Sequence, residues 1–73
     1  MTLADVVKKG FDKFYEGKCD SISILDVEGE TIKVLKMDEL EKIEAKYLES
    51  DFISIGSSSI MPTRLRIRIN YHE

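Results

Sequence analysis

The sequence predicts an α+β domain in which two helices pack on one face of a four-stranded, mostly antiparallel sheet, in the element order α-β-β-α-β-β. Two segments carry apolar residues at helical spacing, and four others read as short strands bounded by turn residues. The length of 73 residues allows one domain, spanning residues 1–73. Because 42% of the residues are hydrophobic and 34% are charged, the composition is that of a folded chain.

The first helix is expected to begin after Thr2 and to end at Gly17. Thr2 can cap the helix by accepting a backbone N–H, and Asp5 lies in the first turn, where an acid favours the helix dipole. The apolar stripe of this helix has spacings of four, four and three residues and consists of Leu3, Val7, Phe11 and Phe14. Aromatic residues at this spacing indicate a core face rather than a ligand site.

A hairpin is expected next, with strands over 21–27 and 30–37. The residues between them, Asp26 to Gly29, fit a type I turn with glycine in a left-handed bulge position. This turn predicts the register of the two strands.

The register that we expect pairs Ile24 with Ile32 and Ile22 with Val34, which gathers four β-branched residues on one face. The alternative, a shorter loop, would set Ile24 against Lys33 and scatter these residues. We therefore expect the first register, in which the leucines of both strands point to the opposite face.

The second helix is expected to begin at Asp38, which would receive backbone donors while Glu41 reaches back to the cap residue. The residues predicted to be buried are Leu40, Ile43, Tyr47 and Leu48. Acids and lysines would occupy the exposed side of this helix.

Two further strands are expected over 52–56 and 63–71. In the first, Ile53 and Ile55 should point inward, and a serine-rich loop that carries the apolar pair Ile60 and Met61 should follow. That pair either covers the core or marks a contact. The last strand alternates strictly, so that Leu65, Ile67, Ile69 and Tyr71 lie on one face and the three arginines on the other.

If both helices cover one face of the sheet, its other face is open, and this open face is the candidate interaction surface. Lys33 is expected on it, together with six candidate contact residues, which are Leu25, Leu35, Phe52, Arg64, Arg66 and Arg68. Arginine and phenylalanine suit protein interfaces. We therefore expect a small protein-interaction module that self-associates as a homodimer, or binds another protein, through this face.

Charge is distributed unevenly along the chain, whose net charge is −3. Residues 38–51 hold six acids and two lysines, and Glu41 and Glu44 mark an acidic face that could contact the basic strand of a second copy. Two alternatives stay open. The first is weak binding of single-stranded nucleic acid through Phe52 and the arginines, and the second is an acidic phage-type accessory protein that occupies a host target.

An enzyme is not expected. The only histidine, His72, is the penultimate residue, where chain ends usually fray, and with one cysteine, Cys19, it falls short of the usual zinc ligand set. We expect no metal and no cofactor. A lone cysteine, the absence of an apolar leader and the absence of a long apolar run favour a cytoplasmic protein that does not enter the membrane.

Overall fold

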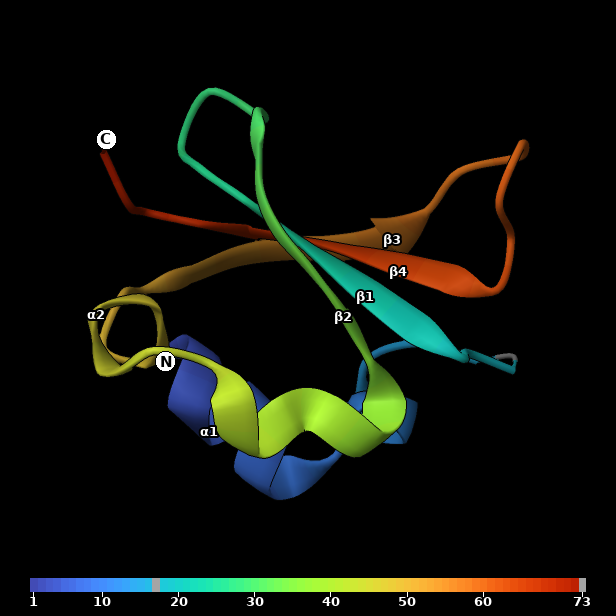
Figure 1. The fold of residues 1–73 in the computed structure, drawn as a ribbon, viewed down its shortest axis with the longest axis horizontal. Helices are drawn as coiled ribbons and strands as arrows, with labels where there is room; N and C mark the ends of the chain where they lie inside the picture. The colour runs from blue at the N-terminus through green and yellow to red at the C-terminus, as the bar shows by residue number, and fades with distance from the viewer. Residues whose placement is uncertain (17, 73) are drawn as a thin grey trace.

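The computed structural model describes residues 1–16 and 18–72 and shows a layer of helices packed on one face of a four-stranded sheet (Figure 1). The predicted α+β class and element order are confirmed. Each expected helix is divided into two short segments. The helical segments are α1 (Leu3–Lys9), η1 (Phe11–Lys13), η2 (Met37–Lys42) and α2 (Ala45–Leu48), and the strands are β1 (Ser21–Leu25), β2 (Thr31–Lys36), β3 (Phe52–Ser57) and β4 (Arg64–Ile69).

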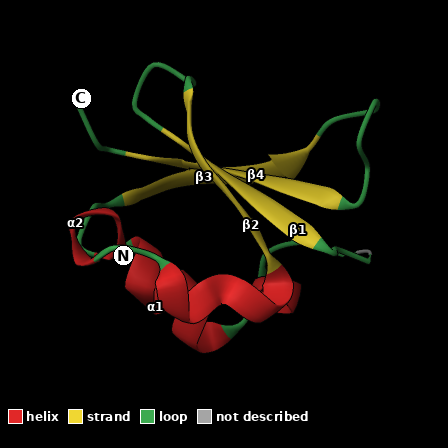
Figure 2. Cartoon of the chain, in the orientation of Figure 1, coloured by secondary structure: helices red, strands yellow, loops and turns green. Residues whose placement is uncertain are grey.

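The sheet has the strand order β2-β1-β4-β3. The pairs β1–β2 and β3–β4 are antiparallel, while β1 and β4 at the centre are parallel, so the sheet is mixed. Between the parallel strands β1 and β4, the chain forms β2, the helical segments η2 and α2, and the edge strand β3. All helical segments lie on the same side of the sheet, which leaves its other face uncovered (Figure 2).

The helix α1 begins as the sequence predicts and ends earlier. The N–H of Asp5 donates to Thr2 Oγ1 at 3.3 Å, and the N–H of Thr2 donates to the Asp5 carboxylate at 3.0 Å. Gly10, with φ of 95°, ends the helix after two turns, because it takes a left-handed conformation that few other residues adopt. The expected end at Gly17 lies outside the described residues.

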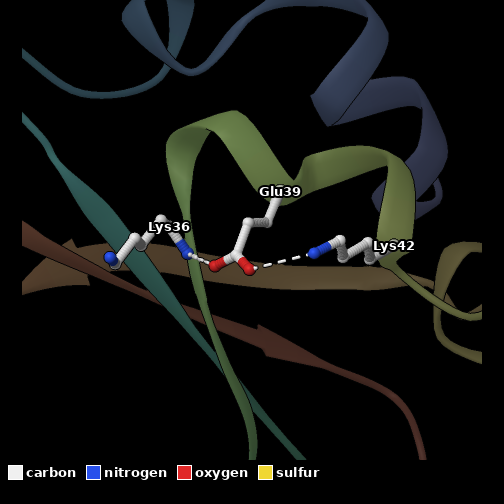
Figure 3. Close-up of polar contacts among 3 residues, drawn as sticks. All are labelled: Lys36, Glu39 and Lys42. Carbon is white, nitrogen blue, oxygen red and sulfur yellow. Dashed lines mark hydrogen bonds and ion pairs between the residues drawn. The ribbon is translucent and has the colours of Figure 1, made fainter.

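The segment η2 is capped by Glu39, and not by the expected pair of Asp38 and Glu41. The Glu39 carboxylate accepts the backbone N–H of Lys36 at 3.0 Å and lies 3.3 Å from Lys42 Nζ (Figure 3). The hydrogen bond from the Lys36 backbone N–H is the main cause that lowers the pKa of Glu39, and the contact with Lys42 lowers this pKa further. The helical segment starts one residue earlier than expected, so the acid that reaches back to its first turn is Glu39.

Of the four side chains predicted to be buried in the second helix, two are buried and two are partly buried. Ile43 has extended backbone and separates η2 from α2, but its side chain and that of Tyr47 lie in the core. Leu40 and Leu48 pack against that core. The apolar pattern was therefore informative although the helix is not continuous.

The β1–β2 hairpin has the expected turn but not the expected register. Gly29 has φ of 88°, and its N–H donates to the Asp26 carbonyl at 3.0 Å. The strands pair Ile22 with Leu35 and Ile24 with Lys33, and the register shifts between Ile24 and Leu25. Our expected pairing is wrong, because this irregularity moves β2 by one residue and a one-residue slip exchanges its two faces.

A second irregularity lies at the start of β3. Phe52 pairs with Ile69 and Ser54 with Arg68, so Ile53 is the extra residue of a bulge and is 44% exposed. Phe52 packs against the core, with its ring 5.7 Å from that of Phe14. The expected inward orientation of Ile53 is wrong, and that of Ile55, which packs on the core, is confirmed.

The core lies between the helix layer and the inner face of the sheet. The three inward side chains of β4 are fully buried, as the alternating pattern predicts, and Tyr71 packs edge-on against Tyr47. The buried cluster consists of Leu3, Val6, Phe11, Ile22, Ile24, Leu35, Ile43, Tyr47, Leu65, Ile67 and Ile69.

Candidate functional site

The uncovered face of the sheet, called the open face below, is polar and basic. Residues paired across strands point to the same side, so Ser21 shares this side with Arg64 and Lys36, and Ser23 shares it with Arg66 and Val34. Lys33, expected on this face, pairs instead with the buried Ile24. The strand residues of the open face are Ser21, Ser23, Leu25, Thr31, Val34, Lys36, Ser54, Gly56, Arg64, Arg66 and Arg68. None of these is an acid, so the strands present four cations without a compensating charge.

The structure brings together four of the six candidate contact residues expected on this face. Arg64, Arg66 and Arg68 lie in a row along β4, and Leu25 lies beside Arg68. Leu25 is only 5% exposed, so it lies beneath its neighbours on the open face and offers little area for contact with a partner.

The expected placement of Leu35 and Phe52 on the open face is wrong. Leu35 is 5% exposed and belongs to the core cluster, and Phe52 packs against that cluster. The irregularities in β1–β2 and at the start of β3 turn both side chains to the inner face. The apolar part of any contact must come from other residues.

Those residues are Val34, Ile60 and Met61, which are 46%, 88% and 45% exposed. Val34 lies on the open face, and the other two come from the loop before β4. Ile60 and Met61 do not cover the core. Two adjacent apolar residues within a serine-rich loop were the sequence signal for this part of the surface.

The three arginines of β4 differ in their contacts. Arg64 Nε donates to Ser21 Oγ at 3.0 Å, and the guanidinium of Arg68 donates to the Val27 carbonyl through Nε, at 2.8 Å, and through Nη2. Arg66 is exposed and has no hydrogen bond or ion pair with any residue in the described part of the chain. Arg64 and Arg68 are therefore partly committed to the fold, while the donors of Arg66 are available to a ligand.

Two shallow depressions flank Arg66, which lines both. The first, of about 280 Å³, is mainly polar and is lined by Leu25, Gly29, Ser54, Ile55, Gly56, Ser57, Arg66 and Arg68. The second, of about 260 Å³, is lined by Ser23, Ser58, Ile60, Met61, Arg64 and Arg66. A guanidinium between a more polar depression and a more apolar one suits an acidic side chain next to an apolar one on a partner.

The acidic residues Glu41 and Glu44 are exposed on the helix layer, away from the open face. The Glu44 carboxylate lies 3.6 Å from Lys46 Nζ, so part of its charge is compensated. Tyr47 and Tyr71, followed by Glu44, raise the pKa of Lys46, whose Nζ is 5.1 Å from the centre of the Tyr47 ring. The basic and acidic surfaces therefore lie on opposite sides of the molecule.

Among the described residues, those that carry nucleophilic or metal chemistry do not form a cluster. Burial, and then the charge of Asp20, raise the pKa of the Cys19 thiol, which disfavours the reactive thiolate. His72 is exposed and lines a hollow of about 160 Å³ with Asp26, Val27 and Glu28. Across residues 1–16 and 18–72, no three His, Cys, Asp or Glu side chains gather in a way that could hold a metal ion.

No protein-family model matches the chain, and no curated protein or solved structure is significantly similar to it. Within the described ranges, no helix is long and apolar enough to cross a bilayer.

Gly56 lines the first depression, and replacing it with alanine tests whether the space beside it is open. Its φ is outside the left-handed region, and no atom lies within 4 Å of where a Cβ would stand. We expect Gly56→Ala to raise the free energy of unfolding by about 0.5–1 kcal/mol, because glycine costs conformational entropy in a strand. Urea unfolding would measure this change. Gly29→Ala is the control, since its φ of 88° makes an added side chain strained, and a gain in stability there would contradict the turn geometry.

Proposed function

We propose that this chain is a non-enzymatic, cytoplasmic interaction module whose open face binds an acidic and partly apolar protein surface. The observation that supports the proposal is Arg66, an exposed arginine without a partner among the described residues, placed between two depressions and beside the exposed Ile60 and Met61. Arginine and methionine are enriched in protein interfaces relative to the rest of a protein surface.

The sign of the charge restricts how a second copy could bind. Two open faces packed directly against each other would place the cations of β4 against their own counterparts, which is repulsive. The helix layer of a second copy, with Glu41 and Glu44, has the opposite sign and is exposed. Self-association through the open face is therefore proposed as a contact between the open face of one copy and the acidic helix layer of another.

The expected affinity is modest. Burying Ile60 and Met61 would contribute about 1.5–3 kcal/mol each, while association costs about 4–15 kcal/mol before any contact is counted. The surrounding charges would choose the partner and its orientation more than they would add to affinity. A weak, salt-dependent complex is the result to expect.

Single-stranded nucleic acid is less well supported as a ligand. Sequence-tolerant binding of single strands relies on aromatic side chains that stack with bases. All six aromatic residues of the chain lie in the core or pack against it, Phe52 included. The role of an acidic accessory protein is weakened by the ion pairs of Glu39 and Glu44 with lysines.

The test is the native mass, measured by size-exclusion chromatography with light scattering at low and high salt, for the wild type, Arg66→Glu and the control Lys8→Glu. Lys8 is also exposed but lies on α1, so its reversal changes the charge equally on the other side of the molecule. We expect a complex that dissociates at high salt, is lost in Arg66→Glu and persists in Lys8→Glu. A salt-dependent complex that tolerates Arg66→Glu would contradict the proposed contact.

If the chain does not self-associate through this face, an outside partner is tested directly. Two fluorescent probes would be titrated: a peptide of alternating glutamate and leucine, and a single-stranded oligonucleotide. We expect the peptide to bind, with about tenfold weaker binding to Arg66→Glu, which corresponds to the loss of one charge-assisted contact. Tighter binding of the oligonucleotide than of the peptide, or no binding of either probe, would overturn the proposal.

A further inference from the structure

The two edge strands of the sheet differ in how their outer edges are protected. The edge strand β2 carries Lys33 and Lys36, and charged side chains, lysine above all, discourage pairing with another strand. The edge strand β3, with the sequence FISIGS, has no charged residue. An uncharged edge is a template to which another strand can add.

Among the described residues, backbone hydrogen bonds cover only the beginning of β3, and the Tyr15 hydroxyl lies 2.7 Å from Ser57 Oγ at its end. The N–H of Phe52 donates to the Met1 carbonyl at 2.7 Å, and the N–H of Leu3 donates to the Ser50 carbonyl at 2.9 Å. Past Phe52, no backbone hydrogen bond reaches the outer edge of β3 from any residue that the structure describes. From Ser54 to Ser57 the strand pairs regularly with β4, so its outer edge there is a regular unpaired row.

Two residues of this edge suit the close approach of another strand. Ile53 is 44% exposed and lies next to this open backbone edge, where its apolar side chain is available for contact. Nothing within the chain requires glycine at position 56, where a Cβ would meet no atom within 4 Å. Glycine inside a strand often marks the place where another backbone approaches closely.

We propose that β3 pairs antiparallel with β3 of a second copy around a two-fold axis, joining the two four-stranded sheets into one continuous sheet. Pairing around Ile55 sets Ile55 opposite Ile55 and Ser54 opposite Gly56, so paired residues share a side of the sheet and no charges are opposed. A second copy suits this edge because the contact is self-complementary, whereas two open faces repel each other. The inference goes beyond the proposed function, since it uses the edge and leaves both open faces available, side by side.

The test compares Ile53→Lys with Val34→Lys. The two side chains are β-branched, lie one on each edge strand and are almost equally exposed, at 44% and 46%. Native mass would be followed over about a hundredfold dilution, because a dimer of modest affinity dissociates on dilution. We expect Ile53→Lys to raise the dissociation constant of the dimer by about tenfold or more, and Val34→Lys to leave it unchanged. The edge-paired dimer should persist at high salt, where only association through the open face should be lost.

Hydrogen exchange of the wild-type protein tests the same dimer without any substitution, so it does not depend on whether a variant folds. The amides of residues 53–57 should exchange more slowly at high than at low protein concentration, while those of 31–36 should not change. A monomer at every concentration would overturn the inference, and so would a dimer that resists Ile53→Lys but is lost in Val34→Lys or Arg66→Glu. Peptide binding that requires Arg66 in a monomeric protein would leave the proposed function intact while this inference fails.

Discussion

Ile67→Ala is expected to lower the free energy of unfolding by about 2–5 kcal/mol, the range for truncation of a buried isoleucine to alanine. Ile67 is fully buried at the centre of the sheet, where it pairs with Ile24 of β1 and with Ile55 of β3. The cavity would therefore open between three strands at once. For a chain of 73 residues the total stability is about 4–11 kcal/mol, so this loss would be a large fraction of the total.

Urea unfolding followed by circular dichroism would measure this loss, with Ile60→Ala as the control. Ile60 is 88% exposed, so the same chemical change there should alter the free energy of unfolding by less than about 0.5 kcal/mol. Similar losses at the two positions would contradict the arrangement in which β4 lies between β1 and β3 with Ile67 in the core.

Arg68→Met is expected to lower the free energy of unfolding by about 1–3 kcal/mol, because hydrogen bonds from charged groups contribute about that much. The guanidinium of Arg68 reaches from β4 to the Val27 carbonyl, just after β1, and its aliphatic part lies beside the buried Leu25. Val27 also donates its N–H to the Tyr71 carbonyl at 3.0 Å. The arginine thus helps to tie the end of β1 to the end of β4.

Arg66→Met is the matched control, two residues along the same face of the same strand. Arg66 has no hydrogen bond or ion pair with the described part of the chain, so its replacement should change the free energy of unfolding by less than about 0.5 kcal/mol. Thermal unfolding of both variants, next to binding of the acidic peptide, would separate the roles. Equal stability losses would show that Arg66 is also held by the fold, which would remove the main support for the proposed function.

Periodicity carried the parts of the fold that were predicted correctly. In β4, strict alternation needs only the two-residue repeat of a strand, and its three inward residues are all fully buried. The cap of α1 was also predictable, because Thr2 and Asp5 interact within a single turn. Such local signals do not depend on what lies elsewhere in the chain.

The candidate site was predicted only in part, and the errors have a common cause. Leu35 and Phe52 were assigned to the wrong face because β1–β2 and β3–β4 each contain a register irregularity. One extra residue exchanges the two faces of a strand, so an assignment made by counting from the turn is inverted from that point onward. The exposed loop residues Ile60 and Met61 supply the apolar surface that the sequence predicted from Leu35 and Phe52.

By itself, the sequence determined the α+β class, the element order, the residues of the second helix that face the core and the row of three arginines, because each depends on short-range spacing and residue type. Only the tertiary structure decided the parallel pairing of β1 with β4, the register of both edge strands and the difference between Arg66 and its two neighbours. These features depend on which strands meet and on what packs beneath them. Which distant residues come into contact depends on the packing of the whole core as well as on local pairing preferences. A short stretch of sequence does not contain that information.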